Sequence, residues 1–263
     1  MKRLMMIGFG AMAEEVLKLL PEGMVLGWVV ATERSRDRIA RQVGNQVQVI
    51  TAVAACDGRP DLVLECAGQA GVRAHGAAVL QRGWDLMMIS IGALADRQLA
   101  DQLYAAAAIG KARLHALPGA IAGIDGLAAA REGGLHQVTY TCRKNPQSWR
   151  GSPAESMIDL ATIKQPQVFF EGTARQAALT FPANANVAAT IALASLGLDG
   201  IRVQLVVDPF TTTNQHQIEA YGRFGEMSIQ LCGKPLDNNP KTSTLAALSV
   251  VRACRQSVST LVI

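Results

Sequence analysis

The sequence predicts an α/β protein in which a doubly wound parallel sheet is followed by a second α+β domain built on a mostly antiparallel sheet. Over residues 1–118, short apolar runs alternate with helical stretches, and this rhythm favours parallel strands joined by crossover helices. Beyond Pro118 the pattern changes to period-two strands separated by turns. This change of rhythm predicts a domain boundary.

The chain opens with a strand, a glycine loop and a helix. The apolar run Leu4–Ile7 leads into Gly8-Phe9-Gly10-Ala11-Met12-Ala13. The first glycine permits a tight turn, the second lets a pyrophosphate approach the backbone, and the small alanine allows close helix–strand packing. The helix that follows directs free N–H groups and its positive dipole end at the phosphates. An ordinary glycine turn is the alternative. The Rossmann interpretation predicts cofactor contacts from Gly8, Gly10, Ala11, Met12 and Ala13.

The remaining elements of the first domain follow in regular order. A helix over residues 14–20 and a strand over 25–30 come directly after the loop. Apolar runs and helical patterns then alternate up to Pro118. They predict strands at 47–50, 61–66, 85–91 and 112–117, and helices at 35–43, 72–81 and 96–109.

The second domain has a different pattern. Strands are predicted at 136–143, 201–208, 215–221 and 226–232, with a hairpin turn at Gly222–Gly225 and helices at 152–162, 173–179 and 187–197. A last helix is predicted to begin at Asn239-Pro240-Lys241, with asparagine as N-cap and proline in the first turn. We therefore expect a dinucleotide-binding domain of residues 1–118 and a substrate and dimerisation domain of residues 119–239. The helix at 240–263 is expected to pack back on the first domain.

Composition narrows the function. The chain has 263 residues, of which 49% are hydrophobic, as in a globular protein. Its longest apolar run, Val187–Leu198, is shorter than the about 20 residues that a membrane span needs. The five cysteines form no C-x-x-C motif and predict reduced thiols without a metal site. A net charge of only +4, on scattered basic residues, favours an anionic small molecule over nucleic acid. We expect a cytoplasmic protein without a nucleic-acid or membrane partner.

Residues after the second strand bear on the choice between NAD and NADP. Glu33 stands slightly beyond the position of the acid that binds a ribose hydroxyl. Arg34, Ser35 and Arg36 follow at once, and such a group can hold a 2′-phosphate. A solvated helix start is the alternative. The loop that begins with Cys66 and Ala67 lies at the carboxyl end of another strand, where such sheets bind ligands.

One histidine stands out in the second half. His216 shares a strand face with Ile218 and Ala220, so it is expected to point inward. A satisfied core histidine is the alternative, but a group that titrates near neutrality suits acid–base chemistry. No lysine is expected on an inward strand face. Arg143, Lys144 and Lys241 are candidate ligands for substrate carboxylates, and a surface lysine is the alternative for Lys241.

Several segments of the chain are distinctive, above all Gly119–Asp125, Arg143-Lys144, Asn184–Val187, Asn214–His216 and Asn239–Ser243. Together with the glycine loop they resemble the bacterial and archaeal L-aspartate dehydrogenase family, and the resemblance covers nearly the whole chain. It implies NAD- or NADP-dependent oxidation of L-aspartate to iminoaspartate, which yields oxaloacetate and ammonia or enters NAD biosynthesis through quinolinate. It further implies a homodimer, with His216 in the active site and Ala120 and Asn186 at the nicotinamide cofactor.

Two other readings of the sequence compete with this one. Another two-domain dehydrogenase, of sugar or homoserine type, is the first. Sugar dehydrogenases of this architecture carry a Glu-Lys-Pro motif where this chain has Ser90–Leu94 without a lysine. A regulatory protein that senses the nucleotide without catalysis is the second, and it would need no inward histidine.

Overall fold

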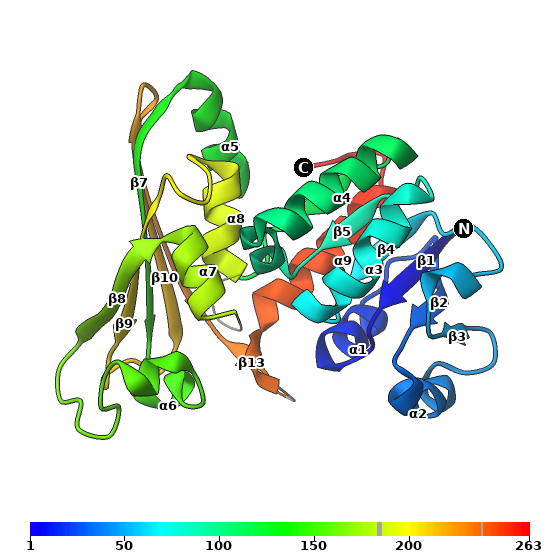
Figure 1. Cartoon of the computed structure of the whole chain (residues 1–263), viewed down its shortest axis with the longest axis horizontal. Helices are drawn as coiled ribbons and strands as arrows, with labels where there is room; N and C mark the ends of the chain where they lie inside the picture. The colour runs from blue at the N-terminus through cyan, green and yellow to red at the C-terminus, as the bar shows by residue number, and fades with distance from the viewer. Residues whose placement is uncertain (183–185, 238) are drawn as a thin grey trace. The chain divides into compact units, whose positions relative to one another are not determined.

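The computed structural model describes residues 1–182, 186–237 and 239–263, and the chain forms two compact units. The first unit comprises Met1–Gly119 together with Ala246–Ile263, and the second comprises Ala120–Leu245. Each unit has its own sheet (Figure 1). None of the helices among the described residues is long and apolar enough to cross a membrane.

The first unit is built on a six-stranded parallel sheet in the order β3-β2-β1-β4-β5-β6. The order reverses between β1 and β4, and ligands of such sheets bind beyond the carboxyl ends of the strands at this switch point. The strands are β1 (Lys2–Ile7), β2 (Met24–Val30), β3 (Gln48–Ile50), β4 (Leu62–Glu65), β5 (Leu86–Met88) and β6 (Leu114–Ala116). The predicted doubly wound parallel sheet is confirmed.

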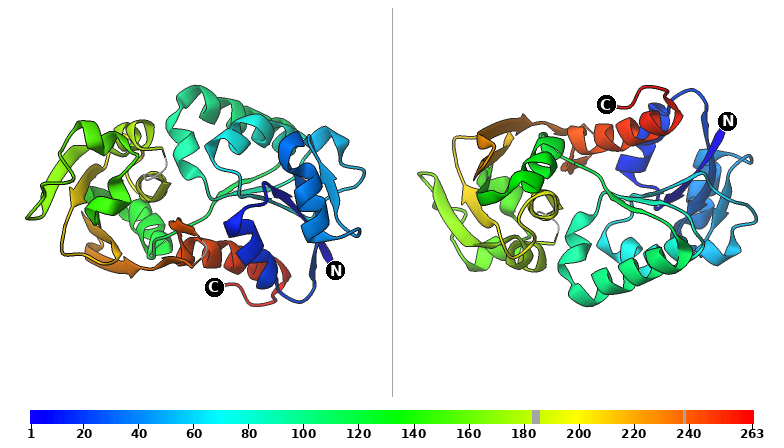
Figure 2. Two further views of the ribbon diagram at one scale, coloured as in Figure 1. Left: turned by 90° about the horizontal axis from the view of Figure 1, so that it is seen from below. Right: turned by 90° about the horizontal axis from the view of Figure 1, so that it is seen from above.

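Helices cover both faces of this sheet, as the two views of Figure 2 show. On one face, α1 (Ala11–Lys18), α2 (Glu33–Val43) and α9 (Thr244–Val258) share an apolar core with β1 and β2. On the other, α3 (Gln69–Gln81) packs against α4 (Arg97–Gly110) and the strands β4 and β5. Val250 and Cys254 of α9 are fully buried against the sheet, so the C-terminal helix is part of the first unit's core.

The second unit is built on a five-stranded mixed sheet in the order β11-β10-β7-β9-β8. Only β7 and β9 run parallel, so the sheet is mostly antiparallel, as predicted. Its strands are β7 (Leu135–Lys144), β8 (Gln167–Thr173), β9 (Arg202–Val207), β10 (Asn214–Gly222) and β11 (Gly225–Gly233). The helices α5 (Ile124–Gly133), α7 (Ala174–Thr180) and α8 (Asn186–Ala194) pack with the sheet and with one another. Gly222 pairs with Gly225, which confirms the predicted hairpin turn.

One predicted helix of this unit is wrong, and the start of the C-terminal helix was predicted too early. The segment 152–162 forms only the 3-10 turn Pro153–Ser156 beyond the short helix α6 (Pro146–Trp149), and the strand β8 follows it without having been predicted. The last helix does not begin at Asn239. Residues Asn239–Ser243 form β13, which pairs with β12 (Pro235–Leu236). The helix begins only at Thr244, whose side chain donates to the carbonyl of Pro235 at 2.9 Å.

Candidate functional site

The glycine loop has the geometry of a phosphate cradle. Gly8 has φ +83°, and a Cβ there would lie 2.6 Å from the Cβ of Ala67, so only glycine fits. A Cβ on Gly10 would meet no atom of the described residues within 4 Å. Gly10 is the N-cap of α1, and among the residues described here no side chain caps that helix. The space and the free N–H groups together fit a bound pyrophosphate.

The predicted contact residues of this loop have different exposures. Ala11 and Met12 begin α1 and are half-buried, whereas Ala13 is buried against the sheet. Ala13 therefore provides close packing, and Ala11 and Met12 stand in the uncapped first turn of α1.

The loop between β4 and α3 lies beside the glycine loop. Cys66 donates its backbone N–H to the carbonyl of Ile7 at 2.9 Å, and Ala67 contacts Gly8. Gly68, with φ +84°, begins α3 without a side-chain cap from the described residues. The Cys66 thiol is close to Cys254, and burial raises its pKa well above the usual range, so it stays protonated. Cys66 and Ala67 therefore lie at the carboxyl edge of the sheet, next to the glycine loop.

The polar residues 33–36, which follow β2, lie at the solvent-facing start of α2. Glu33 pairs with Arg36 at 3.3 Å, and the hydroxyl of Ser35 lies 2.9 Å from that of Thr32. Arg34 is exposed to solvent. An acid and two arginines therefore stand together at the carboxyl end of β2, where a cofactor's ribose is recognised.

In the second unit, the buried face of the sheet carries polar groups among its apolar side chains. Val138, Tyr140 and Cys142 of β7 are buried, and Cys142 pairs with His216 of β10. His216 is 6% exposed, and its Nδ1 lies 2.7 Å from the hydroxyl of Tyr140. The two rings are nearly parallel, with centroids 6.0 Å apart. The predicted inward orientation of His216 is thus what the structure shows, and Nδ1 is the ring nitrogen that faces Tyr140.

Burial sets the charge of this pair. Desolvation, with a smaller contribution from the charge of Lys144, lowers the pKa of His216 to about 4. The imidazole is therefore neutral at the pH of the cell. Burial also raises the pKa of Tyr140 well above 10, so its hydroxyl keeps its proton.

The prediction that no lysine lies on an inward strand face is wrong. β7 continues one residue past the predicted end, and Lys144 follows Tyr140 and Cys142 in the same alternation. Its Nζ lies 5.0 Å from the centre of the Trp149 ring. A positive charge thus stands on the same sheet face as His216.

The other predicted residues of this unit are placed as follows. Arg143 is on the opposite face and donates to the carboxylate of Asp208 at 2.9 Å. Ala120 lies in the turn before α5, and Asn186 is the first residue of α8, where its carbonyl accepts from Thr190. The side chain of Lys241, and Asn184, lie outside the described residues. Within the described ranges, no cluster of three or more His, Cys, Asp or Glu side chains could hold a metal ion.

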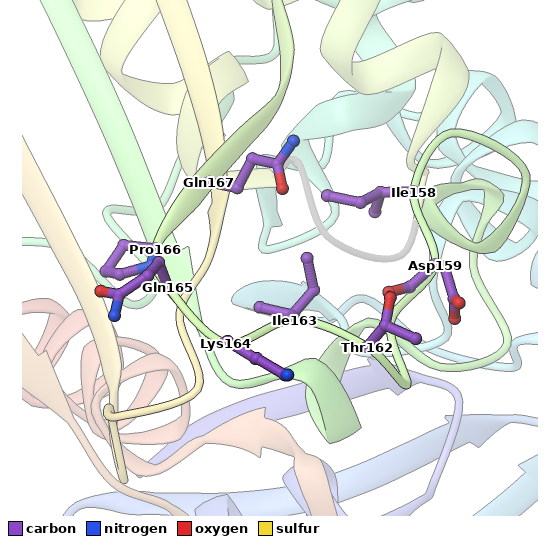
Figure 3. A pocket seen from close by; sticks show the side chains of 8 residues that line it. All are labelled: Ile158, Asp159, Thr162, Ile163, Lys164, Gln165, Pro166 and Gln167. Atoms are coloured by element: carbon purple, nitrogen blue, oxygen red, sulfur yellow. The ribbon is translucent and has the colours of Figure 1, made fainter.

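A surface pocket in this unit involves none of these residues. Figure 3 shows that its lining side chains come from the connecting segment 158–166 and from Gln167 at the start of β8. Because no predicted site residue lines it, we assign it no role.

Sequence reasoning missed two residues with direct links to the predicted site. Tyr140 lies within a predicted strand but was assigned no role, and its bond to His216 joins positions 76 residues apart. Glu65 ends the apolar strand β4 and was not predicted to have a role, yet the residue is 1% exposed and its carboxylate accepts hydrogen bonds from two loops. A charged residue at the carboxyl end of a buried parallel strand is the signal that could have identified it.

We expect that Tyr140→Phe lowers kcat about tenfold, because it removes a hydrogen bond worth about 1.4 kcal/mol and leaves Nδ1 unpaired. The phenyl ring keeps the packing, so cofactor affinity should not change. In the background of His216→Ala the same substitution should have no further effect on kcat. Tyr104→Phe, at a half-exposed tyrosine of α4, is the matched control. An equal loss with and without His216 would contradict the coupling.

Taken together, the sheet order, the uncapped glycine loop and the inward histidine of a separate domain define a two-domain NAD-binding dehydrogenase. Residues 8–116 match the family model "homoserine dehydrogenase, NAD binding domain", and residues 125–257 match "aspartate dehydrogenase, C-terminal". The chain belongs to the L-aspartate dehydrogenase family.

Individual relatives agree with this assignment. An L-aspartate dehydrogenase of Acinetobacter baumannii is 57% identical over 98% of both chains, and one of Serratia proteamaculans is 56% identical with the same coverage. The crystal structure of aspartate dehydrogenase from Thermotoga maritima superposes with a TM-score of 0.76, covering 100% of this chain and 99% of its own, at 22% identity. This last likeness shows that the whole fold is shared.

Proposed function

We propose that the protein oxidises L-aspartate to iminoaspartate with NAD or NADP, and that the imine hydrolyses to oxaloacetate and ammonia or enters NAD biosynthesis through quinolinate. The observation that carries the proposal is the buried, neutral His216 held by Tyr140 on a sheet face that also bears Lys144. Membership of the family and the names of its relatives supply the substrate.

The oxidation requires a proton acceptor from the protein and a hydride acceptor from the cofactor. Hydride can leave Cα only when the amine of aspartate is neutral, so a proton must pass to a base or through water. The bound nicotinamide supplies the hydride acceptor. His216 acts through Nε2, as the base at the amine or on the water that attacks the imine. For Nε2 to accept a proton, Nδ1 must carry hydrogen and donate to the hydroxyl oxygen of Tyr140.

The two substrate carboxylates need cationic partners. Of the predicted ligands whose side chains the structure describes, Lys144 is the better placed, since it shares the face of His216. Arg143 is bound to Asp208 on the other face, so it contributes by holding the end of β9 in place. Lys241 stays a candidate. Charge-assisted bonds of this kind orient Cα–H toward the nicotinamide.

In the cofactor site, the backbone of Gly8, Gly10, Ala11 and Met12 binds the pyrophosphate, and Ala120 and Asn186 bind near the nicotinamide. We expect both NAD and NADP to serve, because Glu33 favours the ribose hydroxyl while Arg34 and Ser35 favour the 2′-phosphate. Steady-state kinetics with each cofactor test this. A preference above about a thousandfold, equivalent to roughly 4 kcal/mol, would contradict dual use.

The proposed activity is tested by the appearance of reduced cofactor over a panel of amino acids and sugars, each with NAD and with NADP. We expect absorbance to rise with L-aspartate at alkaline pH. If another amino acid or a sugar is oxidised and L-aspartate is not, the proposal fails. Binding of cofactor without oxidation of any substrate would favour a nucleotide-sensing protein instead.

We also propose that the enzyme is a cytoplasmic homodimer that acts on a small molecule, without a nucleic-acid or membrane partner. The scattered charge and the family resemblance support this. Light scattering of the purified protein tests the dimer.

A further inference from the structure

The carboxylate of Glu65 is the most completely bonded polar side chain of the first unit that the proposed mechanism leaves unused. Glu65 ends β4 and is 1% exposed. Its Oε1 accepts from the backbone N–H groups of Ala67 and Gly68, both at 2.8 Å, and from the hydroxyl of Ser90 at 3.1 Å. Its Oε2 accepts from the backbone N–H of Ser90 at 3.0 Å. Four donors thus converge on one buried carboxylate.

The four donors belong to two different loops. Ala67 and Gly68 lie between β4 and α3, and Ser90 lies between β5 and the 3-10 turn Ile91–Ala95. Both loops stand at the carboxyl edge of the sheet, where β4 is the strand next to the switch point. Ala67 in turn packs against Gly8, so the glycine loop is in contact with the same network.

An acceptor-only side chain is needed at this point. A carboxylate can accept all four bonds, whereas a glutamine amide would direct its own N–H groups at backbone N–H donors. Burial raises the pKa of Glu65, and the bonds from Ser90, Ala67 and Gly68 oppose that rise. Losing a buried acceptor costs more than the bond itself, because the donors left behind stay desolvated.

We propose that Glu65 is a positioning residue that fixes the loops 66–68 and 90–94 as the walls of the nicotinamide end of the cofactor site. It acts through those loops and does not touch the reacting atoms. This inference rests on the cofactor site proposed above and not on the identity of the substrate. None of the four bonds to Glu65 comes from the glycine loop or α1, which would hold the adenosine and pyrophosphate end of the cofactor, so that end is expected to depend less on Glu65.

The test compares the binding of NAD⁺ with that of ADP-ribose, which lacks the nicotinamide, by calorimetry on the whole protein without aspartate. Glu65→Gln is expected to weaken NAD⁺ about tenfold and to leave the affinity for ADP-ribose within about twofold, a tenfold change being about 1.4 kcal/mol. Asp61→Asn is the matched control, because Asp61 precedes the other end of β4 and also accepts a backbone N–H, from Arg3 at 2.7 Å. It should leave both affinities unchanged.

Ser90→Ala provides a second variant that keeps the carboxylate and removes one donor. It should weaken NAD⁺ about two- to fivefold without affecting ADP-ribose, and it decides the question if Glu65→Gln does not fold. Equal losses of both ligands would overturn the proposal by showing a general structural role, and unchanged affinity for NAD⁺ would overturn it as well. Wild-type protein that binds ADP-ribose and NAD⁺ but does not oxidise aspartate would refute the proposed activity and leave this inference standing.

Discussion

Replacing His216 with alanine is expected to lower kcat about 10²- to 10⁴-fold, the usual loss for one acid–base group. The imidazole is buried and is neutral because desolvation lowers its pKa to about 4. Its Nδ1 is bound by Tyr140, so within the described part of the chain Nε2 is the nitrogen that can take up a proton. All its neighbours in the sheet remain when the ring is removed. We therefore expect the affinity for NAD⁺ to change little, since the cofactor cradle belongs to the other unit.

The experiment needs a control variant in which a histidine outside the candidate site is replaced. His115→Ala serves, because His115 lies on β6 of the first unit, is half-buried, and contacts Asp85 at 3.4 Å. Its kcat should stay within about twofold of wild type, as expected when no acid–base group is lost. Circular dichroism melting of both variants separates folding from chemistry. If His216→Ala keeps more than about half of the wild-type kcat, His216 is not an acid–base residue.

The first unit could be predicted well because its signals are local. Each parallel strand is a short apolar run followed by a helix of clear periodicity, and the glycine loop marks the first turn. The C-terminal segment shows where local signals fail. Asn239 and Pro240 have the residue types of a helix start, but they belong to β13, which pairs with β12, and the helix begins only after this strand. The segment 152–162 has helical composition, yet it forms turns that lead into β8.

Only the part of the candidate site that depends on local sequence signals could be predicted. Period-two alternation in β10 is enough to place His216 inward beside Ile218. Its partner Tyr140 depends on the register between β7 and β10, which no local pattern encodes. Lys144 was predicted as a substrate ligand, but its place on the inward face was not predicted, because one extra residue of strand decides whether it faces His216. Glu65 was missed because its donors come from two loops brought together only by the sheet order.

Gly10→Asp is expected to abolish most cofactor binding without destabilising the fold. Gly10 has φ −119° and ψ −167°, an extended conformation open to any residue, and a Cβ there meets no described atom within 4 Å. An aspartate at this N-cap should even stabilise α1, because its carboxylate accepts from the free N–H groups. Those are the groups that would bind the pyrophosphate, and the added negative charge repels it.

We therefore expect Kd for NAD⁺ to rise about 100-fold or more, equivalent to about 2.8 kcal/mol, with Tm unchanged or raised. Gly8→Ala should instead lower Tm. Gly8 has φ +83°, and the added Cβ would lie 2.6 Å from that of Ala67, so the substitution strains the fold itself and any loss of binding would follow from that. Calorimetric titration with NAD⁺ and thermal melting of both variants give the comparison. Wild-type affinity in Gly10→Asp would mean that the phosphates bind elsewhere, because a carboxylate and a pyrophosphate cannot share the same few N–H groups.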